Sequence, residues 1–354
     1  MMTTIGLFNL GTEVGSSSVS SFYLVGAIYN SIVGYIIPVI LLIGIMGNTL
    51  SLVIFIRTRK RADAAVQYLS TLAISDTGFI TTLGAAYWLK DGLAYVTDGA
   101  ISFDLLTYST ATCKLIGFAR HALEFASAWA IVAFTLERVY IVWYPLRRAD
   151  ITARKRTVII IAIWVMSACL SIHRLVLNHI ETNLSASSCY YNTPTAVTFI
   201  ILIFDIIVFS YLPCLFILIA NILILFGIRK AKAKMMSQVL TSKNEHQDGR
   251  LVISLLLVST LYIVFMTPVN VCATHYFYYL KSTRILDASY REMLFYILTF
   301  LDQYSLLNYC SNFIIYGCTL PFYRKEVYSI LSLGMRAVGY HGSDVSMQRG
   351  TRHA

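Results

Sequence analysis

The chain has 354 residues, of which 57% are hydrophobic and only 13% are charged, and its mean hydropathy is +0.67. A soluble domain carries about 25% charged residues, so this composition excludes the soluble class and points to membrane spans. The net charge of +10 then indicates membrane topology and contact with anionic lipid, and gives little reason to expect nucleic acid as a partner.

Seven apolar stretches are long enough to cross a bilayer, since each has at least the roughly 20 residues that a spanning helix needs. They are Phe22–Ile56, Ala65–Leu89, Thr110–Val142, Val158–Leu177, Thr195–Ile228, Leu251–Leu280 and Met293–Leu320. They lack the strict alternation of barrel strands, so the sequence predicts an all-α membrane protein, a bundle of seven transmembrane helices without a second domain.

The basic residues predict the orientation. Of the 28 Lys and Arg, 21 lie on one side of the predicted membrane and seven on the other. The positive-inside rule places the richer side in the cytoplasm. We therefore expect a plasma-membrane protein with an extracellular N-terminal tail over 1–21, the bundle over 22–320 and a cytoplasmic tail over 335–354.

The segment between the bundle and the tail, 321–334, is predicted to be a short amphipathic helix. Phe322, Val327, Ile330 and Leu331 recur there at helical spacing. Such a pattern suits a helix that lies on the inner membrane surface.

Five of the seven cysteines lie inside the apolar stretches, and only Cys113 and Cys189 lie on the outer side. Because the outside is oxidising, these two are predicted to form a disulfide; the alternative is two free thiols. Asn183 begins an Asn-Leu-Ser glycosylation sequence in the same outer loop. The stretch 183–193 of this loop could form a hairpin lid.

Polar residues inside the spans are candidates for function, because burying them in a bilayer is costly. Asp76 lies in the middle of the second span, and four polar residues occur at depths from which they could face it: Asn48, Ser127, Asn308 and Asn312. This ring of oxygens suits a hard cation such as sodium. The alternative is a polar network that only holds the helices together. We expect no other cofactor and no metal centre.

Several motifs occur together at a specific spacing. They are Gly47-Asn48, Leu-Ala-Ile-Ser ending in Asp76, Cys113 twenty-five residues before Arg138, Trp164, Pro213, Pro268, and Asn312 followed by Tyr316. Over nearly the whole chain this set resembles the rhodopsin-like (class A) G-protein-coupled receptors. The local run Glu137–Arg148, ERVYIVWYPLRR, also resembles invertebrate neuropeptide receptors of the FMRFamide type.

The resemblance implies a cytoplasmic switch around Arg138, which neighbouring Glu137 restrains at rest and which is freed when a G protein binds. Asp248 is placed as a second resting partner of Arg138. The implied coupling residues also include Tyr140, Pro145, Leu146, Asn312 and Tyr316. The alternative is that Glu137 and Arg138 form a plain salt bridge that anchors the span.

The chain departs from the family pattern at four positions. Val139 stands where a tyrosine is usual, Met266 replaces a bulky tryptophan, Phe313 replaces a proline, and Asn221 replaces a tyrosine. Without the proline, the seventh helix is expected to be straighter. Opsins are excluded as a subtype, because the position of their retinal lysine is Leu306 here.

The ligand class is read from the outer half of the bundle. Arg120 lies seven residues below Cys113, about 10 Å deeper along the helix, where amine receptors have an aspartate. An arginine suits a carboxylate, a sulfate or a peptide backbone; alternatively it pairs with Glu124 along the helix. The other candidate ligand-binding residues are His121, Arg174, Asp205, Asn270, His275, Asp302 and Tyr304.

Acidic and basic groups with aromatic neighbours suit a short peptide. The sequence therefore predicts a receptor that converts binding of an extracellular ligand, a short neuropeptide, into activation of a heterotrimeric G protein. Arrestin and a receptor kinase are further expected partners. The alternative is a chemosensory receptor for small organic acids or other small molecules. A transporter would show two related halves, a channel a polar filter, and an enzyme a metal cluster or nucleophile–base pair, and the sequence shows no such feature.

Overall fold

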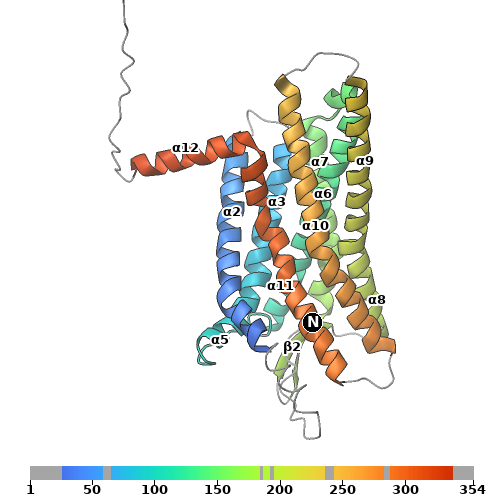
Figure 1. The fold of residues 1–354 in the computed structure, drawn as a ribbon. Helices are drawn as coiled ribbons and strands as arrows, with labels where there is room; N and C mark the ends of the chain where they lie inside the picture. Colours follow the sequence, from blue (N-terminus) through green and yellow to red (C-terminus); the bar gives the residue numbers. More distant parts are fainter. Residues whose placement is uncertain are drawn as a thin grey trace, which may run out of the picture.

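A computed structural model describes residues 26–58, 65–183, 186–191, 195–235, 243–282 and 288–337. These residues form long helices that run side by side as one bundle (Figure 1). The predicted fold, an all-α bundle of seven transmembrane helices, is confirmed.

The first and second spanning helices consist of several pieces, and the third is one long helix. The first helix runs over Gly26–Thr58 and consists of a π-helical turn, Ile32–Ile36, and α2, Ile37–Thr58. The second helix passes through α3, Ala65–Phe79, the π-helical turn Ile80–Gly84, α4, Ala85–Tyr87, the π-helical turn Trp88–Gly92 and α5, Leu93–Val96. The third is α6, Thr110–Trp143, which is followed by a 3-10 turn, Pro145–Asp150.

The remaining elements complete the bundle. They are α7, Ala153–Leu177; strands β1, Asn178–Asn183, and β2, Ala186–Tyr191; α8, Thr195–Ile206; the π-helical turn Ile207–Tyr211; α9, Leu212–Met235; α10, Lys243–Ser282; α11, Ala288–Thr319; and α12, Pro321–Ala337. The sequence predicts the last of these over 321–334. The two strands pair antiparallel, with Asn178 opposite Tyr191.

Five of the described helices are long and apolar enough to cross a membrane: Gly26–Thr58, Thr110–Trp143, Ala153–Leu177, Ala196–Ala231 and Gly249–Tyr279. The other two predicted spans are the α3–α5 segment and α11. The first is interrupted after Phe79 by a π-helical turn. The second carries Asp302, Asn308 and Asn312, which lower its apolar character. Both nevertheless pack inside the bundle, because Asp76 and Leu306 are at most 1% exposed.

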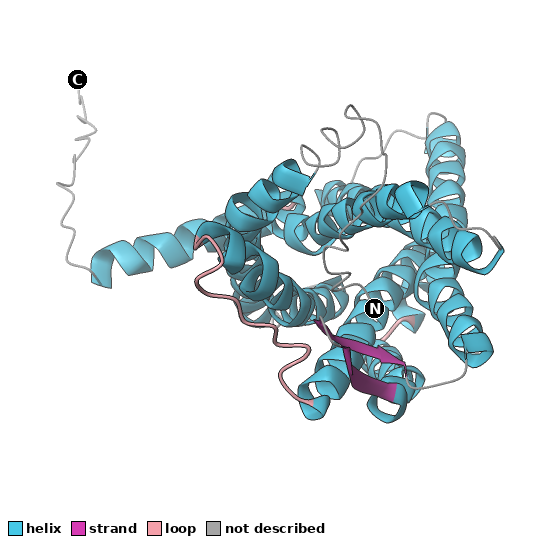
Figure 2. Ribbon diagram, turned by 90° about the horizontal axis from the view of Figure 1, so that it is seen from below, coloured by secondary structure: helices cyan, strands magenta, loops and turns pink. Residues whose placement is uncertain are grey.

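The two ends of the bundle differ. The β-hairpin and α5 lie at one end, and at the other end α12 points away from the bundle (Figures 1 and 2). Tyr323 at the start of α12 shares a hydrogen bond of 2.8 Å with Ser51 of α2, and Arg57 pairs with Glu326 at 3.8 Å. These are called the hairpin end and the α12 end below.

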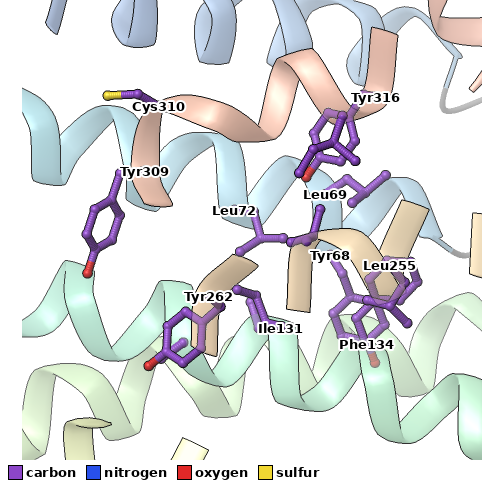
Figure 3. Packing of buried hydrophobic residues seen from close by; sticks show 14 of the residues in the cluster. Tyr68, Leu69, Leu72, Ile131, Phe134, Leu255, Tyr262, Tyr309, Cys310 and Tyr316 are labelled. Atoms are coloured by element: carbon purple, nitrogen blue, oxygen red, sulfur yellow. The ribbon is translucent and has the colours of Figure 1, made fainter. Parts of the chain in front are cut away.

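Aromatic side chains fill much of the core (Figure 3). Tyr68 of α3 stacks on Phe134 of α6 with ring centroids 5.6 Å apart. Phe79 of α3 stacks on Tyr309 of α11 at 4.0 Å. Because α6 packs against α3, α7 and α9, it is the central helix of the bundle. Residues on α6 can therefore contact groups from several other helices at both ends.

The four described π-helical turns all lie in the hairpin half of the bundle. Pro38 helps to explain the first of them, since it has no N–H to donate to the carbonyl of Gly34. The indole Nε1 of Trp88 in the second helix donates to that carbonyl at 3.3 Å. Such turns often occur at functional sites because they re-aim side chains. In the α12 half, the described residues show no π-helical turn.

Candidate functional site

The hairpin is fixed to α6 by a disulfide. Cys113, in the first turn of α6, is bonded to Cys189 of β2, which confirms the predicted pair. The Nδ2 of Asn178 also donates to the backbone oxygen of Cys113 at 3.3 Å. Ser109 caps this helix end, since its Oγ accepts from the N–H of Thr112 at 3.1 Å. The hairpin therefore has a defined place at the end of α6.

The predicted glycosylation residue, Asn183, is the last residue of β1. Its side chain lies outside the described residues, as do residues 184–185 and 192–194. The hairpin spans Asn178–Tyr191 and so starts earlier than the stretch 183–193 named from the sequence.

Arg120 forms an ion pair across the bundle. Its Nη2 lies 3.7 Å from Oδ1 of Asp302, and the two side chains are 31% and 16% exposed. The pair joins α6 to α11 in the hairpin half. Glu124 lies one helical turn from Arg120, but the ion pair within 4.0 Å that the described residues show is with Asp302. We refer to Arg120, Glu124 and Asp302 as the Arg120 cluster.

A second group of charges joins α7 to α8. The Nη2 of Arg174 lies 2.6 Å from Oδ2 of Asp205, and Nε2 of His173 lies 3.5 Å from Oδ1 of the same carboxylate. The ring of His121 lies edge-on to those of His173 and Phe209, with centroids 6.1 and 5.1 Å away. This Arg174 cluster brings three predicted ligand residues together, and it adds His173, which adjoins Arg174 in the sequence.

The other predicted ligand residues lie on α10 and α11. The backbone oxygen of Asn270 accepts from the Tyr211 hydroxyl at 3.4 Å. Nε2 of His275 lies 3.0 Å from the Tyr290 hydroxyl. Tyr304 packs edge-on against Phe265 at 5.1 Å. The last two contacts join α10 to α11, and the first joins α10 to the π-helical turn Ile207–Tyr211. Among the described residues, Asn270, His275 and Tyr304 form no hydrogen bond or ion pair with either charge cluster.

Buried polar atoms without a hydrogen-bond partner occur in both halves of the described structure. Those in the hairpin half include Nε of Arg120, Nδ1 of His121, Nδ2 of Asn270, and both Nε2 and Oε1 of Gln303. Gln303 is only 4% exposed and directly follows Asp302. Sequence reasoning missed it, although its place beside a predicted ligand residue was a usable signal. Buried polar groups normally have partners, so these atoms are candidates for pairing with water or with a polar ligand.

A cavity of about 420 Å³ opens between the first helix and α11 near the hairpin end. It is lined by apolar and aromatic side chains: Ile28, Tyr29, Met293, Tyr296, Ile297, Phe300 and Leu301. The predicted ligand residues are not part of this lining. The cavity therefore provides no support for the assignment of either charge cluster.

Asp76 is the centre of a polar network halfway along the bundle. Its carboxylate is 0% exposed, and it accepts from Ser127 Oγ and from Asn312 Nδ2, each at 2.7 Å. Asn48 instead donates to the backbone oxygen of Tyr309 at 2.8 Å. Asn308 is buried, and its Nδ2 has no partner among the described residues. Two of the four predicted neighbours thus contact Asp76 directly, and helices α3, α6 and α11 are joined.

At the α12 end, Arg138 is 2% exposed and its guanidinium carbon lies 5.1 Å from the ring centroid of Phe134. Neighbouring Glu137 accepts from Nε of Arg156 at 2.9 and 3.1 Å. The sequence offered Arg138 as the partner of Glu137, but Arg156 of α7 was not among the predicted site residues. Its only signal was its place in a basic loop. The side chain of Asp248 lies outside the described residues.

Other predicted coupling residues lie on α6, in the turn after it and on α11. Pro145 and Leu146 form the 3-10 turn after α6, and Leu146 is 98% exposed. Tyr140 packs on Tyr144, with ring centroids 5.4 Å apart. Tyr316 is 1% exposed and lies edge-on to Phe55 at 5.5 Å.

The departures from the family pattern have structural counterparts. Met266 is 4% exposed in the core. Asn221 of α9 accepts from Ser259 Oγ of α10 at 3.0 Å, so it joins two helices. Around Phe313, α11 continues without interruption from Ala288 to Thr319, as expected for a helix that lacks the proline.

Curated proteins with similar sequences include receptors of two kinds. A GQ-coupled rhodopsin of Mizuhopecten yessoensis is 26% identical over 224 residues, which are 61% of this chain and 42% of that protein. The B1 bradykinin receptor of Sus scrofa is 24% identical over 299 residues, 81% of this chain and 78% of that protein. The B1 bradykinin receptor of Canis lupus familiaris is 27% identical over 149 residues, and these cover 38% of it.

Residues 47–316 match the family described as the 7 transmembrane receptor (rhodopsin family). This match covers more than half of the chain and includes α3, α6, the disulfide and the Asp76 network. The chain therefore belongs to the rhodopsin family of seven-transmembrane receptors, which are multi-pass membrane proteins and receptors rather than enzymes.

Proposed function

We propose that this receptor converts the binding of an extracellular ligand, most simply a short peptide, into activation of a heterotrimeric G protein. The proposal of a peptide ligand rests mainly on the two charge clusters in the hairpin half. Arg120 with Asp302, and Arg174 with Asp205, offer both charge signs on four different helices. A peptide carries an amide backbone and both kinds of charge, so it can use both clusters.

The partnerless polar atoms support the same proposal. Asn270 and Gln303 are amides that can both donate and accept, and a peptide backbone presents matching groups. Leaving such groups unpaired costs about 1–3 kcal/mol each, so a ligand that pairs with them gains affinity. The similarity to B1 bradykinin receptors, whose name refers to a peptide, agrees with this proposal.

The proposed orientation places the hairpin end outside and the α12 end in the cytoplasm of a cell, at the plasma membrane. The disulfide supports this, because such bonds persist in oxidising compartments. The basic residues support it too, since Arg57, Arg324 and Lys325 lie at the α12 end, where the rule for positive charges expects the cytoplasm. The N-terminal tail is then extracellular.

The cytoplasmic side of the proposal involves Arg138. This guanidinium is buried under the ring of Phe134 beside the exposed turn that carries Leu146. A buried arginine near a helix end can change partner and hydration between two states, which suits a switch. Arrestin and a receptor kinase are proposed as further partners of the cytoplasmic face.

The second candidate function is a receptor for small organic acids. Arg120 favours it, because its planar guanidinium matches a carboxylate. A light receptor is not proposed: Leu306, 1% exposed, occupies the position of the retinal lysine, and a leucine has no amine to form a Schiff base.

The test is G-protein activation in cells that express the chain, challenged with tissue extract before and after protease digestion. Activity that digestion removes supports a peptide ligand. Activity that survives digestion supports the small-acid alternative. Cells that carry the empty vector are the control, and silence in both arms despite surface expression would contradict the proposed function.

A further inference from the structure

Arg156, on α7, forms an ion pair with Glu137 in the switch region. Its Nε donates to both carboxylate oxygens of Glu137, at 2.9 and 3.1 Å, and the two side chains are 9% and 5% exposed. Glu137 is the residue directly before Arg138. The carboxylate of Glu137 therefore pairs with Arg156 of another helix and also belongs to the sequence neighbour of Arg138.

We propose that Arg156 is a positioning residue of the switch, which holds Glu137 and so sets how strongly this carboxylate restrains Arg138. The inference rests on the proposed G-protein function and deepens it. Arg156 itself does not need to contact a G protein. It acts through the shared partner, Glu137.

The local sequence shows that the position of Arg156 is specific. Arg154, Lys155 and Arg156 are consecutive in the first turns of α7, yet only Arg156 is buried, at 7% exposure. A cation near a helix N-terminus is disfavoured by the helix dipole, and burying a charge is costly unless it is paired. The pair with Glu137 offsets both costs, so burial of Arg156 depends on that carboxylate.

Competition for one carboxylate gives the direction of the effect. A carboxylate has two oxygens and about four lone-pair sites, and Nε of Arg156 takes a share of both oxygens. Without Arg156, the negative charge of Glu137 is left with Arg138 as the neighbouring cation on its own helix. The restraint on Arg138 then becomes stronger and the resting state more populated. Arg156 thus keeps the switch easier to open.

The experiment compares four variants of the full chain in lipid nanodiscs: Arg156→Gln, Arg154→Gln, Glu137→Gln, and Arg156→Gln with Glu137→Gln. Arg154→Gln is the matched control, because it removes the same charge from the same helix turn at an exposed position. One readout is ligand-free nucleotide exchange on purified heterotrimers. The other is an environment-sensitive fluorophore at Gly249→Cys, where a side chain meets no neighbour within 4 Å. The exposed Cys169 and Cys318 are replaced by serine for the labelling.

We expect Arg156→Gln to lower ligand-free exchange about threefold or more, and to shift the α10 label toward its resting signal, while Arg154→Gln matches the parent chain. The effect should vanish in the Glu137→Gln background, because the shared carboxylate charge is gone. If Arg156 had a purely structural role, Arg156→Gln would change both readouts equally with and without the charge of Glu137. Equal behaviour of Arg156→Gln and Arg154→Gln in both readouts, or an unchanged effect without Glu137, would overturn the positioning role.

The two readouts separate this inference from the proposed function. A label that responds as expected, without exchange on any of the principal heterotrimer classes, supports the positioning role and contradicts G-protein coupling. Exchange that is present but equal in all variants supports coupling and overturns the role of Arg156. A silent label together with absent exchange contradicts both.

Discussion

The ring of Phe313 on α11 packs directly against Gly47 on α2. A Cβ atom added at Gly47 would collide with the Phe313 ring, so the two residues fit only as a small and large pair. Gly47 directly precedes Asn48, which donates to the backbone oxygen of Tyr309 on the same helix α11. The phenylalanine that replaces the family's proline is thus accommodated by a glycine in the first helix.

Gly47→Ala is therefore expected to destabilise the chain by about 1–3 kcal/mol, because overpacking forces side chains or backbone to move. The measurement is the thermal unfolding midpoint in detergent. Gly317→Ala is the control: it is on α11, its added methyl meets no atom within 4 Å, and the change should be neutral or slightly stabilising. Phe313→Ala should rescue much of the loss in Gly47→Ala. A rescue that fails would contradict the proposed contact.

The ion pair between Arg120 and Asp302 leads to a prediction about ligand affinity. Arg120→Ala should weaken the binding of the ligand in the active extract fraction by more than about 1.5 kcal/mol, since a charge-assisted hydrogen bond to the ligand is lost. Radioligand competition with that fraction measures it. Lys114→Ala, which removes a positive charge from the same helix nearer the hairpin, should leave affinity nearly unchanged.

An unchanged affinity for Arg120→Ala would mean that this side chain only stabilises the bundle through Asp302. The double variant Arg120→Asp with Asp302→Arg separates ligand binding from stabilisation of the bundle. It should restore much of the stability lost in the single variants, because the ion pair can form again. It should not restore ligand affinity, because the positive and negative charges have exchanged positions relative to the ligand.

The sequence was sufficient for the seven helices and for the disulfide of Cys113 with Cys189, and it identified Asp76 and Arg138 as polar side chains within the spans, where both are buried. These depend on local properties: the length of an apolar run, the compartment of a cysteine and the cost of a buried charge. The sequence was not sufficient to predict which charged side chains pair with each other. Whether Glu137 meets Arg138 or Arg156 depends on how α6 and α7 rotate and pack against each other. Arg120 likewise could be paired with Asp302 only after α6 and α11 were placed side by side.

Arg138 is the residue on which the proposed coupling depends. Arg138→Ala should abolish or strongly reduce G-protein activation while surface expression remains largely intact, because the proposed switch depends on this guanidinium. Activation by extract and surface labelling of the N-terminal tail measure the two quantities. Arg147→Ala, an exposed arginine in the turn after α6, is the control for loss of positive charge. Unchanged signalling in Arg138→Ala would remove this residue from the switch.

Asp76 gives the last prediction, which concerns sodium. We propose that its carboxylate, with the hydroxyl oxygen of Ser127, can hold this ion, because hard cations prefer oxygen ligands, while Asn312 Nδ2 donates to the carboxylate and fixes its position. Sodium chloride should then stabilise the purified chain relative to N-methylglucamine chloride at equal ionic strength. The gain is about 1.4 kcal/mol when sodium is tenfold above its dissociation constant.

Asp76→Asn should remove this sodium dependence, since the amide keeps the size of the side chain but lacks its negative charge. Asp98→Asn, at an exposed loop position with a φ of 50°, should retain the dependence of the parent chain. Equal stabilisation of the parent chain by both salts would mean that the three residues form a network that only joins α3, α6 and α11. In that case Asp76→Asn should still lower the unfolding midpoint, because its buried partners lose a charged acceptor.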